Sequence, residues 1–124
     1  MPMRVVIFVS SLALALGAGA EASPSLGTVA GLVTRGPVTP VCAAEQPCDA
    51  PAAHVTLVFS RAARDVTRVT TGSDGRYRVR LAAGLYGVRR LHSTTPDRKL
   101  EPQSVRVRGG RVSRIDFSID TGIR

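Results

Sequence analysis

A strictly alternating segment, residues 75–81, constrains the fold of this chain more than any other feature. Its apolar and arginine residues take turns, with Tyr77, Val79 and Leu81 set against Arg76, Arg78 and Arg80. Successive side chains of a β-strand point to opposite faces of the sheet, so this segment predicts a strand with one face in a core and one in solvent. Turn-forming residues precede it at 72–75 and follow it at 82–84. The arrangement is typical of an antiparallel β-sheet.

The same period of two recurs along most of the chain and predicts seven strands without a convincing helix. The segments are 26–34, 54–60, 65–71, 75–81, 85–91, 103–108 and 111–120. Short strands at about ten-residue spacing are the pattern of a two-sheet sandwich. We therefore predict an all-β fold, a seven-stranded antiparallel β-sandwich. The Gly109-Gly110 pair between the last two segments predicts a tight hairpin.

The first 22 residues have the organisation of a secretory signal peptide. Arg4 provides a positive charge, residues 5–18 are uncharged and apolar, and the small residues around Ala20 and Ala22 suit cleavage. The alternative is an uncleaved membrane anchor, but the apolar run is shorter than the ~20 residues of a spanning helix. We expect a leader at 1–22, one domain at 23–124, no transmembrane segment after cleavage, and a secreted or cell-envelope location.

Cys42 and Cys48 are the only cysteines of the chain. A small core in an oxidising compartment gains stability from a disulfide, and these two residues offer the sole intrachain pairing. A redox or metal site is the alternative reading. Five intervening residues do not match a redox Cys-x-x-Cys, and neither histidine has zinc-ligand spacing from the pair. The sequence therefore predicts one loop disulfide.

Several motifs together resemble the transthyretin-like, carboxypeptidase-regulatory-like domains, and small secreted bacterial single-domain members in particular. They are Gly31, the turn at 73–77, the Gly-Leu-Tyr at 84–86, the strand at 105–107, the Gly-Pro-x-x-Pro-x-Cys loop at 36–42 with Cys48, and the ending at 120–124. The resemblance covers nearly all of 23–124. It implies a prealbumin-like, Ig-like sandwich that serves as an accessory, structural or binding module without chemistry of its own.

An enzyme is the alternative that the resemblance raises, because hydroxyisourate hydrolases share this fold and use histidines and an arginine. His54, His92 and Arg124 are the residues that this chain could offer. Those enzymes end in Tyr-Arg-Gly-Ser, whereas this chain ends in Thr-Gly-Ile-Arg. Neither a Gly-x-Ser-x-Gly elbow nor a His-Glu-x-x-His helix is present. We predict a protein that is not an enzyme, with no catalytic residues, no cofactor and no metal.

Two tyrosines and one aspartate receive structural roles. Tyr77 and Tyr86 should face the core and bond their hydroxyls to backbone groups, because a buried phenol needs a partner. Asp74 should cap its turn, since no run of alternating oxygen ligands surrounds it for calcium.

The formal net charge of +8 rests almost wholly on arginine. Arg76, Arg78 and Arg80 share one face of a predicted strand, and Arg106 and Arg108 share one face of another. If both strands belong to one sheet, the five form a basic stripe able to hold phosphates or carboxylates. The alternative is that arginine keeps solvent faces soluble and protects strand edges. No aromatic residues interleave with the arginines, so we do not expect specific nucleic-acid binding.

The sequence thus predicts a secreted, non-enzymatic β-sandwich that acts as a structural or binding module. Its partner is not identified by the sequence. The alternatives are a basic adaptor that binds an anionic cell-envelope polymer through the arginine stripe, docking on an envelope protein, and a hydroxyisourate-hydrolase-like enzyme.

Overall fold

The computed structural model describes residues 25–42 and 48–123, so the predicted leader at 1–22 and the terminal Arg124 lie outside the described residues. This part of the chain is built from strands, turns and loops, and it contains no helix suited to crossing a membrane. The strands are β1 (Leu26–Gly36), β2 (Ala50–Pro51), β3 (Thr56–Arg61), β4 (Arg64–Thr70), β5 (Arg76–Ala82), β6 (Gly84–Arg90), β7 (Leu100–Glu101), β8 (Ser104–Val107), β9 (Val112–Arg114) and β10 (Phe117–Asp120).

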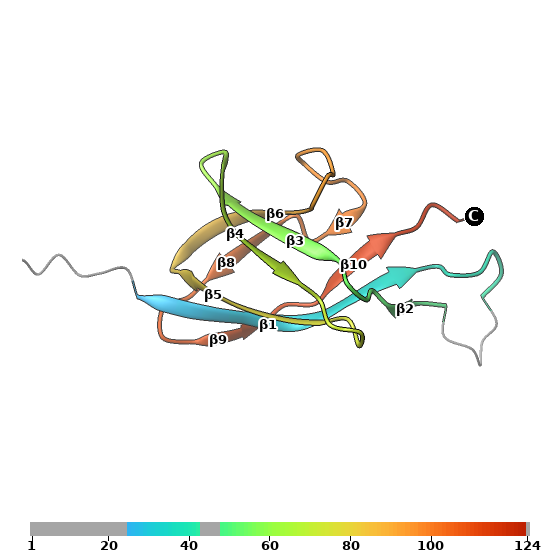
Figure 1. Cartoon of the computed structure of the whole chain (residues 1–124), viewed down its shortest axis with the longest axis horizontal. Coiled ribbons are helices and arrows are strands. Elements are labelled where there is room, and N and C mark those ends of the chain that lie inside the picture. Colours follow the sequence, from blue (N-terminus) through green and yellow to red (C-terminus); the bar gives the residue numbers. More distant parts are fainter. Residues whose placement is uncertain (1–24, 43–47, 124) are drawn as a thin grey trace, which may run out of the picture.

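Two sheets form the sandwich (Figure 1). One contains β4, β3, β6 and β8 in that order. In the other, β2, β5, β9 and β10 pair with β1, and β7 pairs with β10. The inward positions of both sheets build one core, and its largest fully buried side chains are Tyr86, Phe59, Phe117, Leu57 and Leu100. The two-sheet all-β prediction is therefore confirmed.

β1 organises the larger sheet because its two halves have different neighbours. Its first half pairs antiparallel with β5 and parallel with β9, and its second half pairs antiparallel with β2 and parallel with β10. Val29 and Val33 point inward and are fully buried. The even-numbered residues that alternate with this inward face, Thr28, Ala30 and Leu32, point to the outer face.

The seven predicted strands are present, with differences at the C-terminal segment. Residues 111–120 form two strands, β9 and β10, because the strand is interrupted at Ile115 and Asp116. There the Asp116 carboxylate accepts a hydrogen bond from the Leu32 backbone N–H at 2.9 Å, which takes the place of a ladder bond. β2 and β7 are two-residue additions. The sheet around β1 is mixed rather than purely antiparallel.

The predicted Gly109-Gly110 hairpin is wrong. β8 pairs with β6 in the four-stranded sheet, whereas β9 pairs with β1 in the other sheet, so this turn carries the chain between sheets. Gly110 has φ +72° and donates its N–H to the Leu26 carbonyl at 2.9 Å. Paired glycines permit a hairpin turn and also a turn that crosses between sheets. The alternation of apolar and polar residues on either side does not distinguish the two.

The structural roles predicted for the tyrosines and for Asp74 are confirmed. The Tyr77 hydroxyl donates to the Ile115 carbonyl, and the Tyr86 hydroxyl donates to the Ala82 carbonyl at 2.6 Å. Asp74 Oδ1 accepts the Arg76 backbone N–H at 3.0 Å, which closes the β4–β5 turn.

The Cys42–Cys48 disulfide is formed, with 5.3 Å between the two Cα atoms. The bond closes the loop between β1 and β2. Val38 donates its backbone N–H to the Cys48 carbonyl at 2.7 Å, and the Thr121 hydroxyl donates to the Pro37 carbonyl at 2.6 Å. These contacts fasten the loop beside the C-terminal end of β10.

Candidate functional site

The five arginines of the predicted stripe do not share a face. Arg76, Arg78 and Arg80 lie on β5, next to β1, whereas Arg106 lies on β8, next to β6, and Arg108 directly follows β8. The outer faces of the two sheets point in opposite directions. The stripe as predicted from the sequence is therefore corrected, because its condition that both strands belong to one sheet is not met.

The β5 arginines instead face a second basic row across β1. The pairing register sets Arg76, Arg78 and Arg80 beside Leu32, Ala30 and Thr28, and β9 sets Val112 and Arg114 beside Thr28 and Ala30 from the other side. We call this surface the arginine groove. Its walls are Arg76, Arg78 and Arg80 on one side and Arg111 and Arg114 on the other, and its floor is Leu26, Thr28, Ala30 and Val112.

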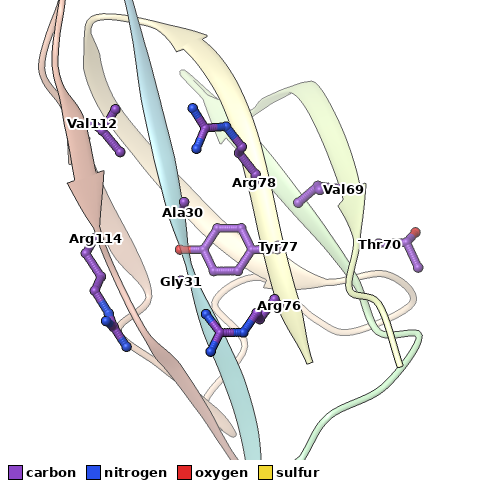
Figure 2. Close-up of a pocket in the computed structure, with 9 residues that line it drawn as sticks. All are labelled: Ala30, Gly31, Val69, Thr70, Arg76, Tyr77, Arg78, Val112 and Arg114. Carbon is purple, nitrogen blue, oxygen red and sulfur yellow. The ribbon is translucent and has the colours of Figure 1, made fainter. Parts of the chain in front are cut away.

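Two adjoining hollows make up the arginine groove. The larger has a volume of about 550 Å³ and also extends past β5 to Val69 and Thr70 of β4, and the smaller has a volume of about 340 Å³. Both are lined by Arg78 and Val112. Figure 2 shows Arg76 and Arg78 extending from β5 toward β1, with Val112 and Arg114 on the other side of that strand. The groove therefore runs along β1 with guanidinium groups on both walls.

The floor of the groove is apolar and open to solvent. Leu26 is 51% exposed and Val112 is 64% exposed. Ala30 leaves space above β1 because its side chain is short, and Thr28 is buried. A cationic rim over an exposed apolar floor is suited to a ligand that carries both charge and aliphatic surface.

The acidic residues near the groove lie at one end of it. Arg76 Nε is 3.7 Å from Asp74 Oδ2, and Arg114 Nε is 3.5 Å from Asp116 Oδ1. The hydrogen bond from the Leu32 N–H, together with the nearby positive charges of Arg114 and Arg76, lowers the pKa of Asp116. Within 25–42 and 48–123, no ion pair involves Arg78, Arg80 or Arg111. Positive charge is therefore least compensated at the Leu26 end.

Tyr77 lies beneath the groove and supports it. Its ring packs against Phe117 with 5.5 Å between ring centroids, and its hydroxyl bonds to the Ile115 carbonyl. Burial, with the negative charge of Asp116, raises the pKa of the Tyr77 phenol, so the group stays neutral and donates its proton to that bond. Gly31 on β1 admits the Ile115 carbonyl so closely that any side chain there would collide with it.

Arg111 and Arg114 were not among the site residues predicted from the sequence. Arg114 alternates with the apolar residues of the segment 111–120 as Asp116 does, so the sequence could have predicted that its side chain points to solvent. The position of β9 beside β1 was not, because alternation identifies the face of a strand and not its neighbour.

The histidines offered for an enzyme lie on the other sheet. His54 precedes β3 and His92 follows β6, and the pairing of these strands places both at the same end of the four-stranded sheet. Both side chains are exposed. Arg124 lies outside the described residues. Across the described ranges, no group of three or more His, Cys, Asp or Glu residues is placed to hold a metal ion.

Two arginines of the four-stranded sheet, Arg89 and Arg90, are engaged in ion pairs. Arg90 Nε donates to Asp97 Oδ2 at 2.7 Å and its Nη2 donates to Oδ1 at 3.1 Å. Burial of Asp97 opposes its charge, but hydrogen bonds from the Arg90 side chain and from the backbone N–H groups of Arg90 and Lys99, with the Arg90 charge, lower the pKa of Asp97 to about 2. Arg89 Nη2 binds both Asp65 oxygens, at 3.1 and 2.9 Å.

No protein-family model and no curated protein matches this chain. Among solved structures, the TIE protein of Bacillus anthracis is 13% identical, with 77% of this chain and 16% of that chain covered and a TM-score of 0.51. GBS52, the minor pilin of Streptococcus agalactiae, is also 13% identical, with 77% of this chain and 44% of that chain covered and a TM-score of 0.51. This chain thus spans less than half of either neighbour. The likeness shows the β-sandwich fold alone, and the transthyretin-like relationship remains a prediction.

Proposed function

We propose that this protein is a non-catalytic module that works outside the cytoplasm and binds an anionic polymer of the cell envelope through the arginine groove. The observation that carries the proposal is the double row of arginines along β1, in which Arg78, Arg80 and Arg111 have no acidic partner in the described part of the chain. Guanidinium groups bind phosphate and carboxylate by paired, charge-assisted hydrogen bonds.

The location proposed here is supported by the cysteine chemistry. A disulfide is a bond of oxidising compartments, and Cys42–Cys48 forms one. The leader predicted at 1–22 supports the same location. Export would bring the groove into contact with envelope polymers and separate it from intracellular nucleic acid.

A structural role within a larger envelope assembly is the second candidate. GBS52 is a minor pilin, and its fold likeness to this chain motivates the idea. Under this alternative the arginines would keep the surface soluble, and partner proteins would meet the disulfide loop or the sheet edges.

Retention on immobilised anionic envelope polymers across a salt series tests the proposal. The variant Arg76→Ser with Arg78→Ser and Arg80→Ser removes the three guanidinium groups of the β5 wall. The matched control is Arg64→Ser with Arg68→Ser and Arg106→Ser, which removes the same charge from exposed residues of the other sheet. We expect wild-type retention to fall steeply with salt, the β5 variant to lose it, and the control to keep most of it.

Equal retention by the two variants would refute the assignment to the groove. Absence of wild-type retention on every polyanion at low salt would refute anion binding altogether and favour the assembly role. Melting curves of both variants establish that they are folded.

A further inference from the structure

We propose that the ligand of the arginine groove is a linear phosphodiester polymer with short aliphatic linkers, lying along β1 at its Leu26 end. This inference rests on the proposed function and specifies its ligand and its subsite. It follows from the charge, the spacing and the floor of the groove.

The distribution of carboxylates selects the Leu26 end. Arg76 and Arg114, at the Leu32 end, already have Asp74 and Asp116 within 3.7 and 3.5 Å. An anion bound there would compete with these carboxylates and would be repelled by them. Arg78, Arg80 and Arg111 face solvent without such partners in the described residues, so a bound anion gains most beside them.

The spacing of the arginines suits a chain with regularly repeated charges. Outward residues of one strand, such as Arg78 and Arg80, recur about every 7 Å, and two strands that flank a third are about 10 Å apart. One extended polymer fits between such walls and can place successive phosphates beside successive guanidinium groups. In Figure 2, Arg76 and Arg78 extend from β5 toward β1. A polymer that lies along β1 would therefore contact these side chains.

The floor favours aliphatic linkers over sugar rings or bases. Leu26 and Val112 offer exposed apolar surface, and the hydroxyl-bearing Thr28 is only 9% exposed. Sugars and bases are usually held by stacking on aromatic faces or by polar side chains. The one aromatic residue along the groove, Tyr77, is 4% exposed and its hydroxyl is already bonded to the Ile115 carbonyl. Short alkyl linkers could instead rest on the floor while their phosphates meet the rim.

Fluorescence anisotropy with labelled oligo(propanediol phosphate) of increasing length is the direct test. We expect affinity to rise steeply up to about three phosphates, one for each of Arg78, Arg80 and Arg111, and only slowly beyond that. The uncharged methylphosphonate oligomer of the same length should not bind. A sulfated polysaccharide of matched charge should bind more weakly, because its rings find neither stacking nor hydrogen-bond partners on the floor.

Paired variants locate the subsite. Arg78→Ser with Arg80→Ser should weaken binding about tenfold and reduce the salt dependence of log K by about 1.4, at about 0.7 per lost phosphate contact. Arg76→Ser with Arg114→Ser should cost less, because these residues already have carboxylate partners. Arg68→Ser with Arg106→Ser, the control of equal charge on the other sheet, should change affinity less than about twofold.

Each contrary result has a definite meaning. Equal losses in the first and third variants would show that net charge alone drives binding, and would overturn the subsite. Tighter binding of the sulfated polysaccharide would overturn the ligand class while leaving the proposed function in place. Failure of both polymers to bind the folded wild-type protein would overturn both proposals.

Discussion

Both sheets carry arginine, but the guanidinium groups meet different surroundings. On the four-stranded sheet, Arg89 and Arg90 end β6 with side chains that are 18% and 27% exposed, and each is held by an aspartate. On the sheet around β1, Arg78 and Arg80 are exposed and have no ion-pair partner in the described residues. The comparison teaches that arginines of one chain can be divided by burial and pairing into those that stabilise the fold and those that remain available to a ligand.

The largest effect should follow from removing the acid of the buried pair. Asp97→Ala leaves Arg90 without its bidentate partner and removes the acceptor for the N–H groups of Arg90 and Lys99. We expect the free energy of unfolding to fall by about 3 kcal/mol, since the Asp97 side chain is only 4% exposed. Urea unfolding measures the change. Arg76→Ala, which breaks the exposed pair with Asp74 and keeps the turn hydrogen bond, serves as the control and should cost far less.

Acid should weaken the same pair next. The pKa of Asp97 is depressed in the folded protein to about 2, so its contribution is complete above its ordinary value of 3.8 and is lost as the pH falls toward about 2. A depression of this size corresponds to about 2 kcal/mol of unfolding free energy. Urea midpoints from pH 5 to pH 2 should therefore decline more steeply for the wild type than for Asp97→Asn. Parallel curves would mean that Asp97 titrates normally.

A smaller effect is expected for the partly exposed pair on β6. Arg89 lies beside Val58 in the β3–β6 register, Val58 is fully buried, and Asp65 is 42% exposed. Arg89→Ser should lower the free energy of unfolding by about 1 kcal/mol through loss of the ion pair and of aliphatic cover. Thermal melts give the shift. A loss as large as that of Asp97→Ala would place Arg89 among the essential structural residues.

The smallest effect on stability should come from the groove. Arg76→Ser with Arg78→Ser and Arg80→Ser removes three exposed side chains, of which Arg76 alone has an ion pair, so we expect a change within about 0.5 kcal/mol. The same variant should lose anion binding. A large drop in melting temperature with binding intact would reverse the roles assigned to the two faces.

Much of the fold could be predicted because each strand carries a local signal. The alternation of Tyr77, Val79 and Leu81 with arginines identified β5 and its buried face, and both tyrosines were given their correct roles. Strand neighbours could not be predicted in the same way. Pairing of β1 with β9 depends on contacts between residues far apart in the sequence, and alternation contains no information about them.

For the same reason, the stripe predicted from the sequence grouped arginines that lie on different sheets. Arg106 and Arg108 have the phase of an outward face, as Arg78 does, yet β8 belongs to the opposite sheet. The predicted stripe required β5 and β8 to share a sheet, and alternation could not test that condition. The close approach of Gly109 to Ser25, which leaves no room for a side chain, occurs where the chain crosses to the sheet of β1.

The parallel pairing of β1 with β10 also determines how this domain would carry a mechanical load. The first and last strands of the domain lie side by side and run in the same direction, with four residue pairs in register from Val33 and Phe117 to Gly36 and Asp120 (Figure 1). A pull on the two ends of the chain would act along these strands in opposite directions. The hydrogen bonds between them would then resist together in shear instead of opening one after another. A domain joined to neighbours through both ends would carry tension along β1, including the half that forms the floor of the arginine groove, and across this strand pair into β10.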